Sequence, residues 1–201
     1  EAIEELPIYR VENQPYIHYR KGALVMYLLQ ERLGEEAVNR ALARFIEAHK
    51  FKSAPYPRSV DLISEFRKEA KTPEQQALIT DLFEKITVYD LKTKSAVTKK
   101  TADGQWTTTI TVEAKKYYAD GAGVEKEAPL AEPIEIGLFT ARPGLAAFNA
   151  KTVVSMEQRM VKAGQQVIVV KSKVKPTFAG IDPYNFYIDR DSDDNLIAVT
   201  D

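Results

Sequence analysis

Histidine and cysteine are the side chains that most often hold a catalytic zinc ion, and this chain has few of them. It contains two histidines, His18 and His49, and no cysteine. A catalytic zinc takes about three protein ligands and leaves one position open. The two histidines lie far apart and neither is followed by Glu, so the His-Glu-x-x-His spacing that puts two ligands on one helical turn is absent. We therefore expect no zinc site within this chain.

A run of acidic residues near the C-terminus could hold a different metal. Residues 189–194 read Asp-Arg-Asp-Ser-Asp-Asp, with the alternating carboxylates of a calcium-binding loop. The run lacks the glycine that such a loop has at its sixth position, and Thr200 stands where the bidentate Glu belongs. We expect a polar turn before a short last strand here, rather than a calcium site.

Aromatic residues offer two further possibilities. Tyr19 is expected near the start of a helix, where spacing alone indicates an aromatic side chain packed against its neighbours. Trp106, Tyr117 and Tyr118 could form the exposed platform of a carbohydrate-binding or adhesive β-sandwich. The alternation of their strand also suits packing, so we rank that hypothesis last.

Apolar residues recur with helical spacing before residue 87 and predict four helices in series. Gly34 is expected to end the first helix, and the prolines of residues 54–57 to separate the second from the third. Ser59 is expected to cap the third helix, and Thr72 with Pro73 to open the fourth. The expected helices cover residues 19–33, 35–49, 60–70 and 73–86.

After Ile86 the apolar residues alternate instead, and the Thr- and Val-rich composition becomes typical of strands. The expected strands cover residues 86–91, 106–118, 134–139, 152–160 and 166–175, with turns at 102–104, 120–123 and 162–164. We therefore predict an α+β fold with segregated halves. A helical part of residues 1–86 would precede an antiparallel β-sandwich domain of residues 87–201.

The charge balance and the apolar runs limit the partners. The 28 basic and 29 acidic residues give a net charge of −1 and form no basic stripe, so nucleic acid is not expected as a partner. The longest apolar run, at residues 22–29, is far shorter than the roughly 20 residues of a membrane span. Because the chain begins at Glu1 rather than Met, we expect a longer protein that contacts a membrane only through segments outside this chain.

Residues 15–29 read Pro-Tyr-Ile-His-Tyr-Arg-Lys-Gly-Ala-Leu-Val-Met-Tyr-Leu-Leu. This pattern resembles the Tyr-x-Lys-Gly-Ala helix of the M1 zinc aminopeptidases. The resemblance continues through residues 33–36, 39–42 and 51–59. Residues 75–90 and 179–190 are similar to one branch of that family, in which a peptidase-like domain is fused to the permease of an ABC transporter.

The resemblance implies roles for particular residues. Tyr19 takes the place of the family's transition-state tyrosine, with Tyr16 as the alternative assignment. Attack of a zinc-bound water on a peptide produces an oxyanion, and a neutral phenol, with a pKa of about 10, can donate a hydrogen bond to it. The family's zinc ligands lie on helices upstream of this one, so zinc would be a cofactor of the full-length protein and not of this chain. Lys21 is interpreted as a surface or ion-paired residue, and Gly22 as a position of close helix packing.

The resemblance also implies a function for the longer protein. We expect the C-terminal part of an M1-like metallopeptidase domain that removes N-terminal residues from peptide substrates, and expect this chain alone to be inactive. The domain would belong to a bacterial inner-membrane protein with an ABC transporter permease and lie on the extracytoplasmic side. The alternative is a non-catalytic, peptidase-like module for binding or structure. Without the upstream helices, apolar surface near residues 19–33 would be exposed and could drive self-association.

Overall fold

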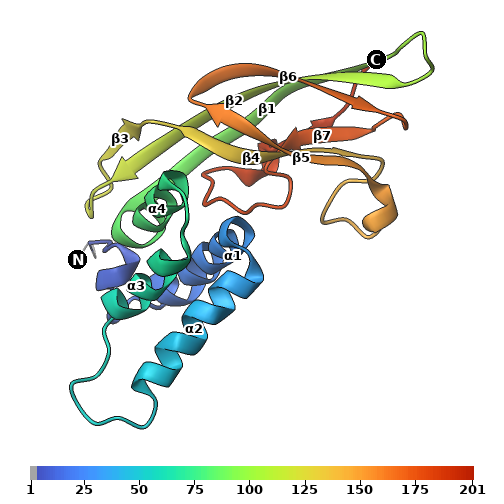
Figure 1. Ribbon diagram of the computed structural model, residues 1–201. Coiled ribbons are helices and arrows are strands. Elements are labelled where there is room, and N and C mark those ends of the chain that lie inside the picture. Colours follow the sequence, from blue (N-terminus) through green and yellow to red (C-terminus); the bar gives the residue numbers. More distant parts are fainter. Residues whose placement is uncertain (1–3) are drawn as a thin grey trace. The chain divides into compact units, whose positions relative to one another are not determined.

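The computed structural model describes residues 4–201 (Figure 1). In this part of the chain, four α-helices come first and eight strands follow. The predicted α+β class, with helices before antiparallel sheets, is confirmed. The chain divides into two compact units. The helical unit comprises Glu1–Thr87, Tyr118–Lys126 and Phe186–Ile188, and the strand unit comprises Val88–Tyr117, Glu127–Asn185 and Asp189–Asp201.

The helical unit contains α-helices joined directly to short π-helical segments. Its elements are η1 (Ile8–Arg10), η2 (Tyr16–Lys21), α1 (Gly22–Leu33), α2 (Glu35–His49), α3 (Ser59–Glu69), α4 (Pro73–Ile79) and η3 (Thr80–Glu84), where η2 and η3 are π-helical. Gly34, with a φ of 88°, ends α1, and the Thr72 hydroxyl accepts a hydrogen bond from the N–H of Gln75 at 3.2 Å. The prediction that Ser59 caps the third helix is wrong. Ser59 is the first residue of α3, and its Oγ donates to the carbonyl oxygen of Tyr9 at 2.5 Å.

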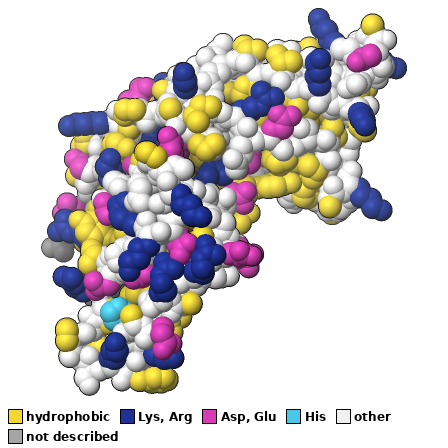
Figure 2. Space-filling model, viewed as in Figure 1, with side chains coloured by type: hydrophobic (Ala, Val, Ile, Leu, Met, Phe, Trp, Pro, Cys, Tyr) yellow, Lys and Arg dark blue, Asp and Glu magenta, His cyan; other side chains and the backbone are white. Residues whose placement is uncertain are grey.

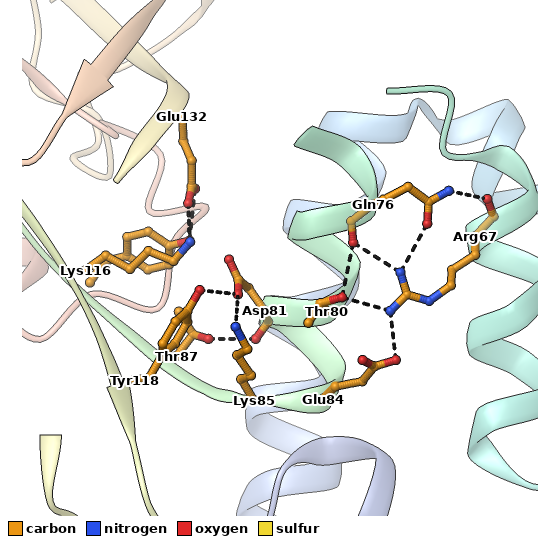
Figure 3. A network of polar contacts seen from close by, with 11 residues as sticks. Arg67, Gln76, Thr80, Asp81, Glu84, Lys85, Thr87, Lys116, Tyr118 and Glu132 are labelled. Atoms are coloured by element: carbon orange, nitrogen blue, oxygen red, sulfur yellow. Dashed lines mark hydrogen bonds and ion pairs between the residues drawn. The ribbon is translucent and has the colours of Figure 1, made fainter. Parts of the chain in front are cut away.

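Apolar residues at helical spacing form the core of the helical unit. Its buried side chains include Val25, Leu28, Leu29, Val38, Ala41, Ile63, Phe66, Ile79, Leu82 and Phe83. Polar contacts join α3 to the segment formed by α4 and η3. Arg67 of α3 donates to Gln76 Oε1 at 3.1 Å and to Thr80 Oγ1 at 2.9 Å, and it pairs with Glu84 at 2.8 Å (Figure 3). Within residues 4–201, no helix combines the length and the apolar character needed to cross a membrane.

The strands form two antiparallel sheets. They are β1 (Ile86–Lys100), β2 (Trp106–Ala119), β3 (Glu125–Ala128), β4 (Ala131–Phe139), β5 (Val153–Lys162), β6 (Gly164–Ser172), β7 (Phe178–Ile181) and β8 (Leu196–Ala198). One sheet has the order β1-β2-β3, with β6 also paired to β2, and the other has the order β5-β4-β7-β8. The register sets Ile110 opposite Ile168 and Ile136 opposite Ile181, and all four side chains are buried. The apolar faces of both sheets are therefore shielded from water in an open β-sandwich.

The strand unit also buries a lysine, whose charged ammonium group must be paired because burial removes its hydration. Lys116 is only 4% exposed, and its Nζ lies 2.6 Å from Glu132 Oε1 (Figure 3). The Tyr89 hydroxyl donates to Glu132 Oε2 at 2.9 Å. Because the carboxylate and the ammonium are paired and hydrogen-bonded, the desolvation of both charges is partly offset.

Candidate functional site

Tyr19, the proposed catalytic residue, lies on η2, which follows Pro15 and runs directly into α1. Its side chain is 74% exposed, whereas Ile17 on the same segment is 2% exposed. The His18 ring lies 4.6 Å from the Tyr19 ring, with a tilt of 50° between the ring planes. Because Ile17 anchors η2 in the core of the helical unit, the segment presents Tyr19 on its outer side.

Tyr19 belongs to a row of exposed apolar side chains along η2 and α1. Tyr16, Leu24 and Tyr27 are 44%, 42% and 46% exposed. With Tyr19 they recur at the spacing of one side of a helix, and we call these four residues the η2–α1 row. The buried side chains of α1, Val25, Leu28 and Leu29, face the opposite way into the core. Apolar surface is therefore exposed along one side of this helix.

The two residues after Arg20 have different surroundings. Lys21 pairs with Glu5, with Nζ 2.7 Å from Oε1, and its side chain is 13% exposed. Its interpretation as an ion-paired residue therefore holds. A Cβ added at Gly22 would meet only the carbonyl oxygen of Ile17, at 3.7 Å, which is an ordinary contact. Within residues 4–201, Gly22 is therefore not a position of close helix packing, and that interpretation is wrong for this part of the chain.

The histidines lie on separate elements. His18 is an exposed residue of η2, and His49 is the last residue of α2, where its ring lies 4.9 Å from the ring of Phe45. In the described part of the chain, no three side chains among His, Cys, Asp and Glu are grouped so that they could hold a metal ion.

The acidic run near the C-terminus ends in a short 3₁₀ helix, η5 (Ser192–Asp194), which precedes β8. Asp189 Oδ1 accepts hydrogen bonds from the N–H groups of Leu91 at 3.3 Å and Asp191 at 3.4 Å. Asp194 Oδ2 lies 2.7 Å from Lys92 Nζ. Burial raises the pKa of the Asp189 carboxyl above its ordinary value. Hydrogen bonds and an ion pair within the fold therefore account for several of these carboxylate oxygens.

The aromatic residues considered for a binding platform are engaged with cations and carboxylates. Lys175 Nζ lies 5.2 Å from the Trp106 ring centroid, and the guanidinium of Arg190 lies 5.0 Å from that of Tyr117. In the helical unit, the Tyr118 hydroxyl donates to Asp81 Oδ1 at 2.8 Å (Figure 3). All three aromatic side chains are only partly exposed. These contacts favour packing over a carbohydrate-binding platform.

Comparisons with the models of known protein families and with curated protein sequences find no match to this chain. What bears on function is therefore the pattern of residues 15–29 and its location in the fold. Tyr19 and Tyr16 lie together on η2, on the exposed side of the helix. Sequence reasoning assigned no role to the loop after α2, where Phe51 and Tyr56 are strongly exposed. The signal that could have identified it is the run Lys-Phe-Lys at residues 50–52.

Proposed function

We propose that this chain is the C-terminal part of an M1-like zinc aminopeptidase domain of a longer protein, with Tyr19 as a hydrogen-bond donor to the reaction's oxyanion. One observation carries the proposal. Tyr19, in the segment that resembles the family's Tyr-x-Lys-Gly-Ala helix, is 74% exposed on an apolar row at the start of α1. A catalytic phenol must be exposed to a substrate in this way, whereas a purely structural tyrosine is better buried.

The geometry around Tyr19 supports a positioned donor. Ile17 is buried and Lys21 is paired with Glu5, so both ends of η2 are anchored. An anchored turn fixes the backbone that carries the phenol, and an oxyanion donor that is preorganised contributes about 3 kcal/mol to transition-state stabilisation. Tyr19 would donate its hydroxyl proton in a hydrogen bond to the developing oxyanion and remain neutral.

The η2–α1 row suggests where the rest of the domain would pack. In the family that this chain resembles, the helices with the zinc ligands precede the Tyr-x-Lys-Gly-Ala helix. We propose that such helices cover Tyr16, Leu24 and Tyr27 and bring the metal near Tyr19. When bound, zinc would supply Lewis-acid activation of water and of the scissile carbonyl. None of the ligands would come from residues 4–201.

The setting of the domain is part of the same proposal. The similarity of residues 75–90 and 179–190 to the permease-fused branch supports attachment to an ABC transporter permease. We propose an extracytoplasmic location at a bacterial inner membrane and a peptide as the substrate. The order of the fold, helices before antiparallel sheets, is compatible with that branch.

The test compares two tyrosines on the same turn. In the longer protein that contains the upstream helices, Tyr19→Phe is expected to lower kcat about 100-fold or more, because an oxyanion donor acts in the transition state. KM and zinc content should change little, since the donor contributes little to ground-state binding. Tyr16→Phe removes the other phenol hydroxyl of η2, which is exposed in this chain alone, and is expected to leave kcat within about threefold of the wild type.

Each outcome of this comparison has a clear meaning. If Tyr16→Phe is the damaging variant, the catalytic assignment moves by one turn to Tyr16. If Tyr19→Phe stays within about threefold of wild type, when losing an oxyanion donor costs far more, Tyr19 is not the donor. A longer protein with no aminopeptidase activity at all would favour the non-catalytic binding or structural module.

A further inference from the structure

A loop joins α2 to α3 within the helical unit (Figure 1). This loop and the residues that flank it carry a second group of exposed apolar side chains. Phe51 is 102% exposed and Tyr56 is 75% exposed. Ile46, before the loop, is 58% exposed, and Val60, after it, is 41% exposed. We call residues 46–60 the α2–α3 tip. Several large apolar side chains exposed close together usually mark an interaction surface.

The backbone at Phe51 adds to this argument. Phe51 has a φ of 58°, in the left-handed region, immediately beyond the last turn of α2. The N–H of Lys52 donates to the carbonyl oxygen of His49 at 3.3 Å, which forms a turn directly after the helix. Glycine or asparagine usually occupies such a position, because a bulky side chain is disfavoured there. A fully exposed Phe in a strained backbone indicates that the ring itself has a role.

The charges of the α2–α3 tip indicate the kind of partner. The tip contains Lys50, Lys52 and Arg58 against one acidic residue, Glu47. Lys50 pairs with Glu47, and Arg58 pairs with Asp61 just after the tip, so residues 46–60 keep an excess of basic side chains. Figure 2 shows hydrophobic side chains beside Lys and Arg, with an acidic side chain among them, at the lower end of the helical unit, where the α2–α3 loop lies in Figure 1. The partner should therefore be anionic at its surface and apolar beneath.

We propose that the α2–α3 tip binds the surface of a bilayer that contains anionic phospholipids. The Phe51 ring inserts below the headgroups, Tyr56 lies at the interface, and the basic side chains contact phosphate oxygens. A projecting apolar residue with flanking cations suits a bilayer better than a preformed protein groove. With one inserted ring and three basic residues, the attachment is weak and reversible. This inference does not depend on the peptidase assignment.

The test measures partition of the 201-residue chain onto vesicles by sedimentation. Vesicles of phosphatidylcholine with phosphatidylglycerol should bind the chain, and vesicles of phosphatidylcholine alone should bind it much less. Phe51→Gly should reduce partition by roughly tenfold or more, since it deletes the inserted side chain. The same variant should melt at the wild-type temperature or above, because glycine relieves the left-handed backbone.

Two further variants test whether the basic side chains contribute to vesicle binding, and whether the loss of any exposed apolar side chain would reduce it. The double variant Lys50→Gln with Lys52→Gln should lower partition by roughly 25-fold, about fivefold for each charge removed, and should weaken the dependence of partition on salt. Leu145→Ser removes a side chain that is 59% exposed in the strand unit, and it should leave partition unchanged.

A fluorescence readout locates the contact. Trp106 is the single tryptophan of the chain, so Phe51→Trp combined with Trp106→Phe gives one reporter at the tip. Its emission should shift to the blue on anionic vesicles. Equal partition of Phe51→Gly and wild type, or no preference for phosphatidylglycerol, would overturn the proposal. Self-association that Phe51→Gly abolishes, without vesicle binding, would assign the tip to a protein partner instead.

Discussion

Tyr19 and Phe51 are both exposed aromatic residues, but they differ in backbone conformation: that of Tyr19 is helical, and that of Phe51 is strained. Tyr19 lies within a helical segment, close to the buried Ile17. Phe51 lies in the left-handed region, where glycine is favoured. A Phe at such a position indicates that its ring has a role of its own. The role of Tyr19 depends instead on which segment covers the η2–α1 row. The family resemblance predicts exposed apolar surface at residues 19–33, which include Tyr19, whereas the one local signal for the exposure of Phe51 is its position between Lys50 and Lys52.

Also at the scale of single residues, the carboxyl of Asp189 is partly buried, and burial disfavours its charged form. Burial raises the pKa of this carboxyl, and hydrogen bonds from the Asn195 side chain and from backbone N–H groups offset only part of that rise. Asp189→Asn keeps an acceptor oxygen for the N–H of Leu91 and removes the charge. We expect the variant to melt roughly 1–3 °C higher than wild type at pH 7, a small effect because the site is partly solvated.

The pH dependence of this difference tests its cause. A carboxyl with a raised pKa in the folded state is penalised at high pH, and the penalty disappears as pH falls through the folded pKa. The advantage of Asp189→Asn should therefore vanish below the ordinary value of 3.8. Differential scanning calorimetry from pH 7 to pH 3 measures it, with the exposed Asp191→Asn as the control. A variant that melts lower than wild type at pH 7 would show that the charge is stabilising.

At the scale of elements, an ionic cluster joins α2 to α3. Arg44 Nε lies 2.8 Å from Glu65 Oε2, and Arg44 Nη1 lies 2.5 Å from Glu69 Oε1. Arg40 Nη2 lies 2.8 Å from Glu69 Oε2. Hydrogen bonds from Arg40, and then from Arg44, lower the pKa of Glu69 to about 2. The cluster sets the two helices side by side at the base of the α2–α3 tip.

This cluster makes the free energy of unfolding of the helical unit depend on pH in the acidic range. A carboxyl whose pKa is lowered on folding stabilises the fold above its ordinary pKa, which is 4.5 for Glu69. That contribution is lost as the pH falls towards about 2. Glu69→Gln should therefore melt lower than wild type at pH 7, by roughly 1–3 °C because the pair lies at the surface. The difference should narrow below pH 4.5 and disappear near pH 2.

Circular dichroism melts at several pH values measure this difference, and high salt should reduce it. Glu36→Gln is the matched control, because Glu36 is 96% exposed and lies 3.9 Å from Arg40. It should have almost no effect. A Glu69→Gln difference that stays constant from pH 7 to pH 2 would mean that packing, and not the charge, is responsible.

Over the whole chain, the spacing of apolar residues predicts most helices and strands. The features that it does not predict are those that depend on contacts between residues far apart in the sequence. The helices and the change to strands near Ile86 follow from apolar spacing. The four-residue strands β3 and β7 are too short to show alternation, and their pairing depends on β2 and β4. Residues 118–126 belong to the helical unit. There the Tyr118 hydroxyl donates a hydrogen bond to Asp81 Oδ1 (Figure 3), a contact that no local sequence pattern predicts.

The last prediction concerns the chain taken alone: it should neither bind zinc tightly nor hydrolyse peptides. His18 on η2 and His49 at the end of α2 belong to separate elements, and no grouped carboxylates complete a ligand set within residues 4–201. A single imidazole with scattered carboxylates binds an ion weakly and leaves the open geometry of a hydrolase unformed. The exposed η2–α1 row should instead favour self-association at high concentration.

Calorimetric titration with zinc and an aminoacyl-anilide assay test the first part, and analytical ultracentrifugation tests the second. Leu24→Lys places a charge in the middle of the η2–α1 row and should shift the chain towards monomer, because a buried lysine without a partner is costly. Leu145→Lys, on an exposed residue of the strand unit, should not. One zinc ion bound per chain at about micromolar affinity, or turnover that a chelator abolishes, would mean that the chain carries its own catalytic centre.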